Sequence, residues 1–350
     1  ITNHVGGTIT SDQRAITVDD SNLGNAFAAV TISNEGTISG ANGEAISITS
    51  TFANTLTNKG TINGTVAMGA GADTVNLYTG SSSGAIDGGA GADTLHLAGT
   101  GKGTLGAVSN IETLKVDAGH WVVSNAQSYT SGGAIAVGAT LQVDHTTASF
   151  GGTFIVSGGL TSDPATLKFN DLSVDPTGYI NAEGGDLYQL ASSFLNHSTQ
   201  NALWDTTTAL LEFTGLAGTS HDLLLTGADR GGFWGGYAQN FAWGELSIDD
   251  GNELVLDSGA PGGGAFYVGS LIGVLFTGDS VTNIVGNGFN IYYDPSAAGN
   301  AYLGGGTYRL LDGGVLMAAV PEPRSIALVL SGLGVLALRR RRRKSKAIAS

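Results

Sequence analysis

The sequence predicts an all-β fold, a right-handed parallel β-solenoid, and two internal repeats carry this prediction. The first repeat reads apolar residue, Thr or Ser, Asn, a turn and Gly-Thr-Ile, and its asparagines Asn3, Asn34 and Asn58 lie 31 and 24 residues apart. The second repeat, Gly69–Leu77, returns as Gly89–Leu97 after 20 residues. Short β-branched strands that recur at such spacings, with glycine-rich turns between them, are typical of stacked coils.

The repeats also predict what lies inside the coils. Inward apolar residues would form a core ladder, and the repeated asparagines would form a ladder of side-chain amides at the turns. Together with the later segment Val108–Leu114 and Trp121 after it, the repeats resemble autotransporter passenger domains over residues 1–160. The resemblance implies a solenoid. No later segment predicts a translocator barrel, so we expect another route of export.

After about residue 151 the repeats weaken, although strand-like runs continue. We expect a β-rich and capping region over 161–317, with a weak helical signal only near 185–204. Aromatic residues in Phe289–Pro295 and Asn300–Gly305 would close the end of the solenoid and protect its last sheet edge. The expected strands in this part are Phe154–Val156, Thr166–Phe169, Leu210–Phe213, Leu223–Leu225, Leu246–Ile248 and Glu253–Leu256.

The segment 318–350 has three parts with different physical properties. Val320, Pro321, Glu322 and Pro323 should be extended and accessible, because proline fixes φ and removes an N–H donor. An uncharged apolar run, Ile326–Leu338, could form a short membrane helix. The basic tail at 339–346 would stay on the cytoplasmic side. Its first residues are Arg339, Arg340, Arg341, Arg342 and Arg343.

This order of motif, apolar run and arginines resembles the PEP-CTERM sorting signal of exported bacterial proteins. The resemblance implies processing by an exosortase, a precursor anchored in the inner membrane, and a final place at the cell surface or outside the cell. The chain opens at Ile1 without an apolar leader, and we therefore expect a signal peptide upstream of it.

Charge is distributed unevenly between the body and the tail. The chain has 15 basic and 29 acidic residues, but 8 of the basic ones lie at Arg324 or later, so residues 1–320 hold 7 basic and 28 acidic residues, a net of −21. Such a body repels nucleic acid and suits cations. The chain has no cysteine, which excludes disulfides and thiol catalysis.

Calcium is the best candidate ligand. Gly88–His96 matches the nonapeptide of calcium-binding RTX repeats, with Asp93 as the carboxylate ligand. Stacked coils would bring Asp73 close to Asp93, with Asp87 nearby. The two copies are 20 residues apart rather than nine, so each coil offers one loop. The alternative is a turn in which the aspartate bonds its own backbone.

Aromatic residues suggest a second candidate site, for sugar. Trp234, Tyr237 and Trp243 could stack on the sugar rings of an exopolysaccharide, and the alternative is that they pack in the core. The G-x-G-x-x-G at Gly101, Gly103 and Gly106 leads into a strand-like run, so we do not interpret it as a dinucleotide site.

From these patterns we expect a non-enzymatic protein with a structural or adhesive role in an extracellular matrix or biofilm, without a cofactor other than calcium. Two alternatives stay open. One is a polysaccharide lyase or hydrolase built on the solenoid, which would need two or more carboxylates converging in a groove. The other is a calcium-dependent binding module.

Overall fold

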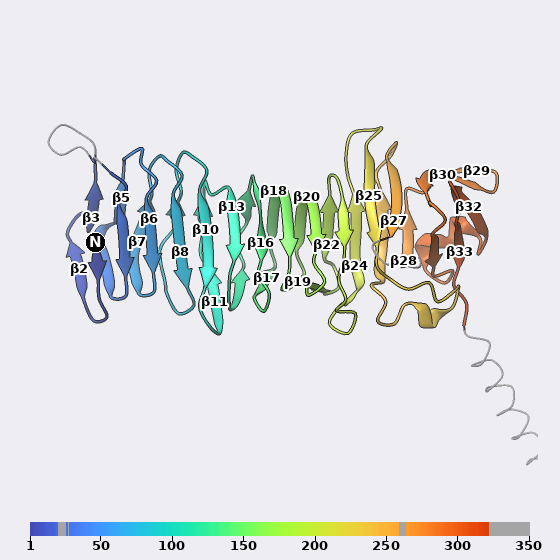
Figure 1. Ribbon diagram of the computed structural model, residues 1–350, viewed down its shortest axis with the longest axis horizontal. Helices are drawn as coiled ribbons and strands as arrows, with labels where there is room; N and C mark the ends of the chain where they lie inside the picture. The colour runs from blue at the N-terminus through green and yellow to red at the C-terminus, as the bar shows by residue number, and fades with distance from the viewer. Residues whose placement is uncertain (20–25, 27, 259–263, 322–350) are drawn as a thin grey trace, which may run out of the picture.

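The computed structural model describes residues 1–19, 26, 28–258 and 264–321. Within them the chain is a long parallel β-solenoid, in which strands stack side by side along the long axis from β1 near the N-terminus to β33 at the opposite end (Figure 1). The predicted all-β, parallel β-solenoid is therefore confirmed. Among the described residues every strand pairing is parallel except β29 with β30 and β32 with β33.

The strands form three sheets, of 22, 5 and 6 strands. The largest holds β1 (Thr2–Asn3), β4 (Thr31–Asn34), β6 (Thr55–Asn58), β8 (Thr74–Tyr78), β10 (Thr94–Ala98), β13 (Thr113–Val116), β15 (Gln127–Tyr129), β16 (Gly132–Ile135), β18 (Thr147–Val156), β20 (Thr166–Val174), β22 (Leu187–Leu190), β23 (Phe194–Asn196), β24 (Thr206–Phe213), β25 (Ser220–Leu225), β26 (Trp243–Ile248), β27 (Glu253–Ser258), β28 (Ala265–Ile272), β29 (Phe276–Thr277), β30 (Ser280–Val285), β31 (Asn290–Tyr293), β32 (Thr307–Leu311) and β33 (Val315–Ala318).

The two smaller sheets cover the other sides of the coils. The five-stranded sheet holds β11 (Lys102–Leu105), β14 (His120–Val123), β17 (Thr140–Asp144), β19 (Gly159–Asp163) and β21 (Tyr179–Ala182). The six-stranded sheet holds β2 (Thr8–Ser11), β3 (Ile16–Val18), β5 (Thr37–Ile48), β7 (Thr61–Ala67), β9 (Ile86–Asp87) and β12 (Val108–Ser109). Two short 3-10 helices, η1 (Trp234–Gly236) and η2 (Ala298–Leu303), interrupt the C-terminal part.

Alternation along each strand places one residue in two inside the coil, and register stacks these residues into columns. One column runs Ile32, Leu56, Val75, Leu95 and Leu114, and all five side chains are fully buried. At about 25 cal/mol per Å² of apolar surface, such columns supply the main stabilising term. The core is therefore one continuous ladder rather than a globular centre.

The predicted amide ladder is confirmed at the first turns. Asn3 Nδ2 donates to Asn34 Oδ1 at 2.8 Å, and Asn34 Nδ2 donates to Asn58 Oδ1 at 2.9 Å. Asn58 Nδ2 ends the ladder on the carbonyl of Ser82 at 3.0 Å. All three asparagines are buried, so these bonds remove the cost of placing amides in the core.

A column of aromatic rings fills the middle coils. Phe150 lies 5.5 Å from Tyr129 and 5.3 Å from Phe169 between ring centroids, and both pairs are stacked. Phe169 continues to Tyr188, whose ring meets Trp243 edge to face at 5.3 Å. Register places Tyr129, Phe150 and Phe169 over one another in β15, β18 and β20. Tyr188 in β22 is in register with Leu167, so its ring stacks on Phe169 from an offset position.

The strand predictions beyond residue 151 are confirmed, and the helical signal near 185–204 is wrong. Those residues form β22 and β23, with Tyr188, Leu190 and Phe194 buried. Leucine, alanine and glutamine favour a helix locally, but pairing with β20 and β24 buries more surface. The end of the solenoid has an antiparallel pair, β32 with β33, and the packed ring of Tyr293.

Part of the predicted sorting segment falls outside the described residues. Glu322, Pro323, the apolar run 326–338 and Arg339–Arg343 belong to this part. Val320 and Pro321 lie inside the described range. In the described part of the chain, no helix is long and apolar enough to cross a bilayer.

Candidate functional site

The aspartates of the second repeat stack one coil apart and form a buried column. Their neighbours Thr74 and Thr94 are in register, and the backbone N–H of Asp73 donates to Asp93 Oδ1 at 2.7 Å. Asp73 Oδ1 in turn accepts from the backbone N–H of Asn54 in the preceding coil at 2.5 Å, and Glu112 Oε2 accepts from that of Asp93 at 2.7 Å. We call Asn54, Asp73, Asp93 and Glu112 the carboxylate column.

One oxygen of each aspartate in the carboxylate column has no partner. Asp73 is 1% exposed and Asp93 is fully buried, yet Asp73 Oδ2 and Asp93 Oδ2 make no hydrogen bond to any described residue. Burial raises the pKa of both carboxyls above the usual value. The negative charges of Asp73, Glu112 and Asp87 raise that of Asp93 further. The structure thus places two buried carboxyl oxygens without hydrogen-bond partners in successive coils.

Of the three predicted calcium ligands, the structure brings two into the column. Asp87 instead accepts hydrogen bonds from the backbone N–H of Gly89 at 3.1 Å and from Asn110 Nδ2 at 2.7 Å. The alternative in which Asp73 and Asp93 bond their own turns is wrong, because each accepts from the preceding coil. Sequence reasoning missed Glu112, since it lies outside the repeat. Glu112 directly precedes Thr113 as Asp93 directly precedes Thr94, and the two threonines are in register. This equivalent position is the signal that could have identified Glu112.

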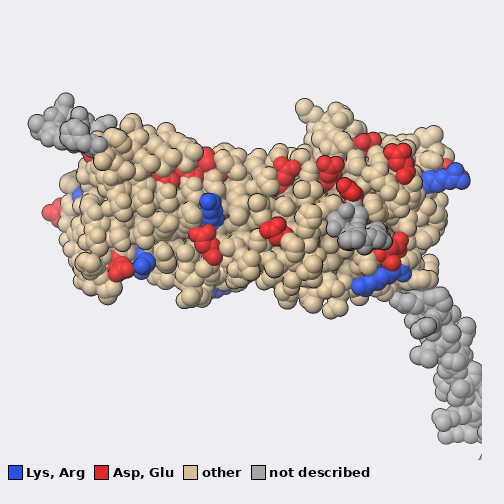
Figure 2. Space-filling model, viewed as in Figure 1, with Lys and Arg blue, Asp and Glu red and all other residues tan. Residues whose placement is uncertain are grey.

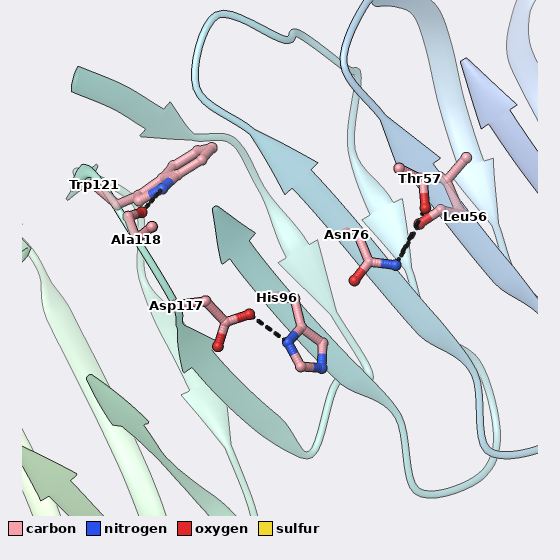
Figure 3. A network of polar contacts seen from close by, with 7 residues as sticks. All are labelled: Leu56, Thr57, Asn76, His96, Asp117, Ala118 and Trp121. Carbon is pink, nitrogen blue, oxygen red and sulfur yellow. Dashed lines mark hydrogen bonds and ion pairs between the residues drawn. The ribbon is translucent and has the colours of Figure 1, made fainter. Parts of the chain in front are cut away.

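The outward face of the same strands carries polar side chains with ordinary partners. Register forms an outward column of Thr57, Asn76, His96 and Lys115. In Figure 3, His96 and Asp117 point toward each other, with 2.7 Å between His96 Nδ1 and Asp117 Oδ2. Asn76 Nδ2 donates to Thr57 Oγ1 at 3.3 Å in the same view. These contacts connect neighbouring coils on the surface.

The predicted sugar-stacking residues line one open groove of about 410 Å³. Trp234 is 48% exposed, Tyr237 is half-buried, and Asp294 and Ser296 lie across from them. Gly269 also lines the groove, and a Cβ at this position would lie 2.3 Å from the carbonyl oxygen of Gly244. We call this the aromatic groove.

Trp243 also borders the aromatic groove, but its ring belongs to the core. It is 1% exposed and packs edge to face against Tyr188 at 5.3 Å and Phe194 at 5.8 Å. Tyr237 donates its hydroxyl to the carbonyl of Val268 at 2.9 Å, and burial raises the pKa of that hydroxyl. Trp234 is therefore the residue of the predicted three whose ring has a large exposed face.

A second open groove, of about 460 Å³, lies beside the aromatic groove and shares Thr207 with it. Its carboxylates are Asp186 and Glu245. Asp186 accepts from the backbone N–H groups of Ala165 at 2.5 Å and Glu183 at 2.6 Å. Glu245 accepts from Ser270 Oγ at 2.7 Å. Both acids thus hold the local backbone or a neighbouring coil.

The structure also groups three residues that the sequence did not connect. Asp144, His145 and Asp163 place one ligand atom each within 4.8 Å of one another, because Asp144 and Asp163 are in register. His145 Nδ1 lies 2.5 Å from Asp144 Oδ1, and this hydrogen bond raises the pKa of the exposed imidazole. Asp144 and His145 are adjacent in the sequence, but Asp163 comes from the next coil. The spacing of the three residues in the sequence therefore did not indicate the group.

The first residues of the predicted sorting segment are part of the folded body. Ala319 is fully buried and donates its N–H to the carbonyl of Tyr293 at 2.8 Å. Val320 pairs with Phe233, with its N–H 2.9 Å from the carbonyl of Gly232 and its carbonyl 3.1 Å from the N–H of Trp234. The loop 229–241, which we call the aromatic loop, thus holds the last described residues of the chain.

The aromatic loop is itself tightly bonded. The Asp229 carboxylate accepts from the Tyr292 hydroxyl at 2.8 Å and from Asn290 Nδ2 at 2.9 Å. Arg230 Nη1 donates to the carbonyl of Ala238 at 2.7 Å, and its backbone N–H donates to the Tyr267 hydroxyl at 2.8 Å. These bonds fix the loop against β28 and β31, so the sorting segment starts from a rigid support.

A comparison with protein families identifies a PEP-CTERM protein-sorting motif at residues 319–344. The motif confirms the sorting signal predicted from the tail, and it implies export, membrane-anchored processing and recognition by an exosortase. It covers the end of the chain and not the solenoid. No curated protein and no solved structure matches the chain significantly.

Proposed function

We propose that this chain, which carries a PEP-CTERM protein-sorting motif, is a non-catalytic structural or adhesive protein of the cell surface or extracellular matrix. One observation carries the proposal. A single series of parallel pairings leads from β1 to β33, directly into the sorting motif. At ~4.8 Å for each pairing, such a series makes a rod of roughly 67 Å. A rod joined to a surface-sorting signal suits a spacer or matrix element.

The surface and the acids support a role without catalysis. Figure 2 shows one face on which charged side chains are scattered, with acidic groups more frequent than basic ones. Hydrolases and lyases need carboxylates or bases that converge on one substrate atom. In the two open grooves described here, Asp186 and Glu245 are occupied by hydrogen bonds, and Asp294 Oδ1 accepts from Ser296 Oγ at 2.6 Å. The carbohydrate-active enzyme stays the alternative function.

The aromatic groove favours sugar as what the protein adheres to. An exposed indole, a neighbouring phenol and polar groups opposite them are the usual elements of a surface that stacks on sugar rings. Titration with exopolysaccharide from a producing cell should change Trp fluorescence, and Trp234→Ala should abolish the change. Fluorescence that stays constant, or changes equally in the variant, would argue against sugar at this groove.

The export part of the proposal is tested by changing the motif itself. A host that contains an exosortase would express the wild type and a variant with Pro321→Ala and Pro323→Ala. We expect the wild type to leave the inner membrane with a reduced mass, while the variant stays there at full mass. A wild type that stays full-length in the inner membrane would contradict the proposal.

The structural role is tested in the same host. Loss of the protein should weaken cell aggregation or matrix cohesion, measured by sedimentation and rheology, and the wild type should restore both. Release of reducing or unsaturated sugar ends from matrix polysaccharide by the purified protein would instead support the enzyme. Unchanged cohesion without the protein would contradict the structural role.

A further inference from the structure

We propose that the carboxylate column binds a hard divalent cation, Ca²⁺, between two adjacent coils, with Asp73 and Asp93 as the central ligands and Glu112 beside them. The observation that points to a ligand is the pair of buried oxygens, Asp73 Oδ2 and Asp93 Oδ2, that no described residue contacts by a hydrogen bond. This inference concerns the N-terminal coils and does not depend on the sorting motif.

The cost of leaving these oxygens alone is large. A buried polar atom without a partner costs about 1–3 kcal/mol, and an ionised one costs more. Here two of them lie in successive coils, where strands are about 4.8 Å apart. A proton on one carboxyl removes one charge, but the resulting hydroxyl still needs an acceptor. One divalent cation between the coils compensates both aspartates at once.

The chain provides an internal comparison at Asn54, which occupies the same column one coil earlier. Its side chain is fully satisfied: Oδ1 accepts from the N–H of Val30 at 3.0 Å, and Nδ2 donates to the carbonyl of Phe52 at 2.7 Å. Each residue of the column caps a backbone N–H of the preceding coil, and an amide does this as well as a carboxylate. Aspartate at 73 and 93 therefore adds only charge and an acceptor oxygen, which are the properties of a cation ligand.

The chemistry of the column selects calcium. Its donors are oxygens only, which suits hard cations. Ca–O distances are about 2.3–2.6 Å, so an ion midway between coils ~4.8 Å apart reaches an oxygen from each coil. Calcium accepts irregular coordination, whereas magnesium requires a near-octahedral set. Asp87 lies close enough for its charge to raise the pKa of Asp93, so it adds to the negative field around the ion.

Glycine is required where the chain passes the column. A side chain at Gly88 would lie 2.0 Å from the carbonyl oxygen of Asn110 and 2.9 Å from Asp93 Oδ2. Only a residue without Cβ lets these two oxygens come so near to the backbone. In the preceding coil the position that corresponds to Gly88 holds the buried Met68. The residue beside Asp93 therefore differs from the residue beside Asp73.

The experiment compares the full chain with Asp73→Asn and Asp93→Asn variants, each measured in EDTA and in millimolar CaCl₂ or MgCl₂. Calcium should raise the midpoint of thermal unfolding of the wild type, and magnesium should do so less. Each variant should weaken calcium binding, measured by calorimetry, by about tenfold or more. In EDTA the variants should be as stable as the wild type or more stable, because a buried charge has been removed. A variant that loses the calcium response but is no less stable in EDTA has lost a cation ligand. A residue that only stabilises the fold would lower the stability in EDTA as well.

Two controls identify the bound position. Asp117→Asn changes an exposed carboxylate near the same coils and should keep the full calcium response. Asp144→Asn changes the exposed cluster with His145 and Asp163 and should also keep it. Absence of binding at millimolar calcium would overturn the proposal. So would a response that survives in both column variants, or one that is lost only in Asp144→Asn.

Discussion

The first coils and the middle coils of the solenoid share one column of the large sheet and fill it with different residues. In the first coils the column holds Asn3, Asn34 and Asn58, joined by amide hydrogen bonds. In the following coils the same column continues as Leu77, Leu97, Val116, Ile135, Val156 and Val174. The backbone ladder is parallel in both regions. Each side chain of the column must instead suit the side chains at the same position in the two neighbouring coils. An amide needs an amide or a carbonyl as its partner, and an alkyl group needs another alkyl group.

The column changes from asparagine to apolar side chains at a coil where a backbone carbonyl can accept the last amide hydrogen bond. Asn58 Nδ2 donates to the carbonyl of Ser82, so the last amide does not face Leu77 without a partner. The Gly-Thr-Ile turns of the first repeat supply further acceptors, as in the bond from Asn34 Nδ2 to the carbonyl of Thr61 at 3.2 Å. The second repeat replaces these turns, and the column becomes apolar. The column and the turn beside it therefore change together.

Placing an amide in the apolar part of the column should cause the largest loss in the free energy of unfolding. Leu97 is fully buried between Leu77 and Val116 in register. Leu97→Asn loses the burial of an alkyl side chain and leaves an amide without a partner, which together cost about 4 kcal/mol. Urea denaturation checks this value, with Leu97→Val as the control for lost volume alone. A cost equal to that of the valine variant would mean that the column tolerates either filling.

The opposite exchange should cost less. Asn34→Leu removes the side-chain hydrogen bonds with Asn3 and Asn58 and the one to the carbonyl of Thr61. However, Asn3 Nδ2 keeps the carbonyl of Thr37 at 3.1 Å, and Asn58 Oδ1 keeps the N–H of Gly60 at 3.2 Å. We expect a loss of about 1–3 kcal/mol in the free energy of unfolding. Replacing all three asparagines by leucine should cost less than the sum of the single changes, because they share bonds. Additive costs would show that the amides act independently.

The smallest expected effect is a difference in pH dependence between the asparagine coils and the later coil that holds His221 in β25. His221 is fully buried near Phe213, and burial lowers its pKa below the usual value, against the raising effect of the Ser192 carbonyl, Asp249 and Asp222. The unfolded chain therefore binds a proton more readily than the folded one. This contribution to stability is fully present above the unfolded pKa of about 6.5 and is lost as the pH falls toward the folded pKa, with a slope of at most about 1.4 kcal/mol per pH unit.

Hydrogen exchange at successively lower pH measures this difference. Coils around His221 should lose protection before the coils that hold Asn34 and Asn58, whose ladder has no titrating group. His221→Phe should make the two regions respond alike. Earlier loss of protection in the asparagine coils would contradict this assignment of the acid-sensitive part.

Sequence periodicity reveals what repeats and misses what the coils assemble from different repeats. The amide ladder and the pairing of Asp73 with Asp93 follow from spacing, since equal positions in successive coils must stack. Glu112 joins the carboxylate column from outside the repeat, and only register places it there. The aromatic groove combines Thr207, Trp234 and Asp294, whose separation in sequence carries no signal. The helical signal near 185–204 failed because local propensity is weaker than the burial gained in β22 and β23.

The bond between Val320 and the aromatic loop has a mechanical consequence. Within the described part of the chain Val320 is the last paired residue, and only Pro321 lies between it and Glu322 in the sequence, a length of at most ~3.6 Å. The folded body therefore includes the first residues of the sorting segment and leaves almost no free chain before Glu322. Any pull on that segment acts first on the two hydrogen bonds of Val320 with Gly232 and Trp234. Tension on the tail would therefore act first on the loop that carries the exposed ring of Trp234.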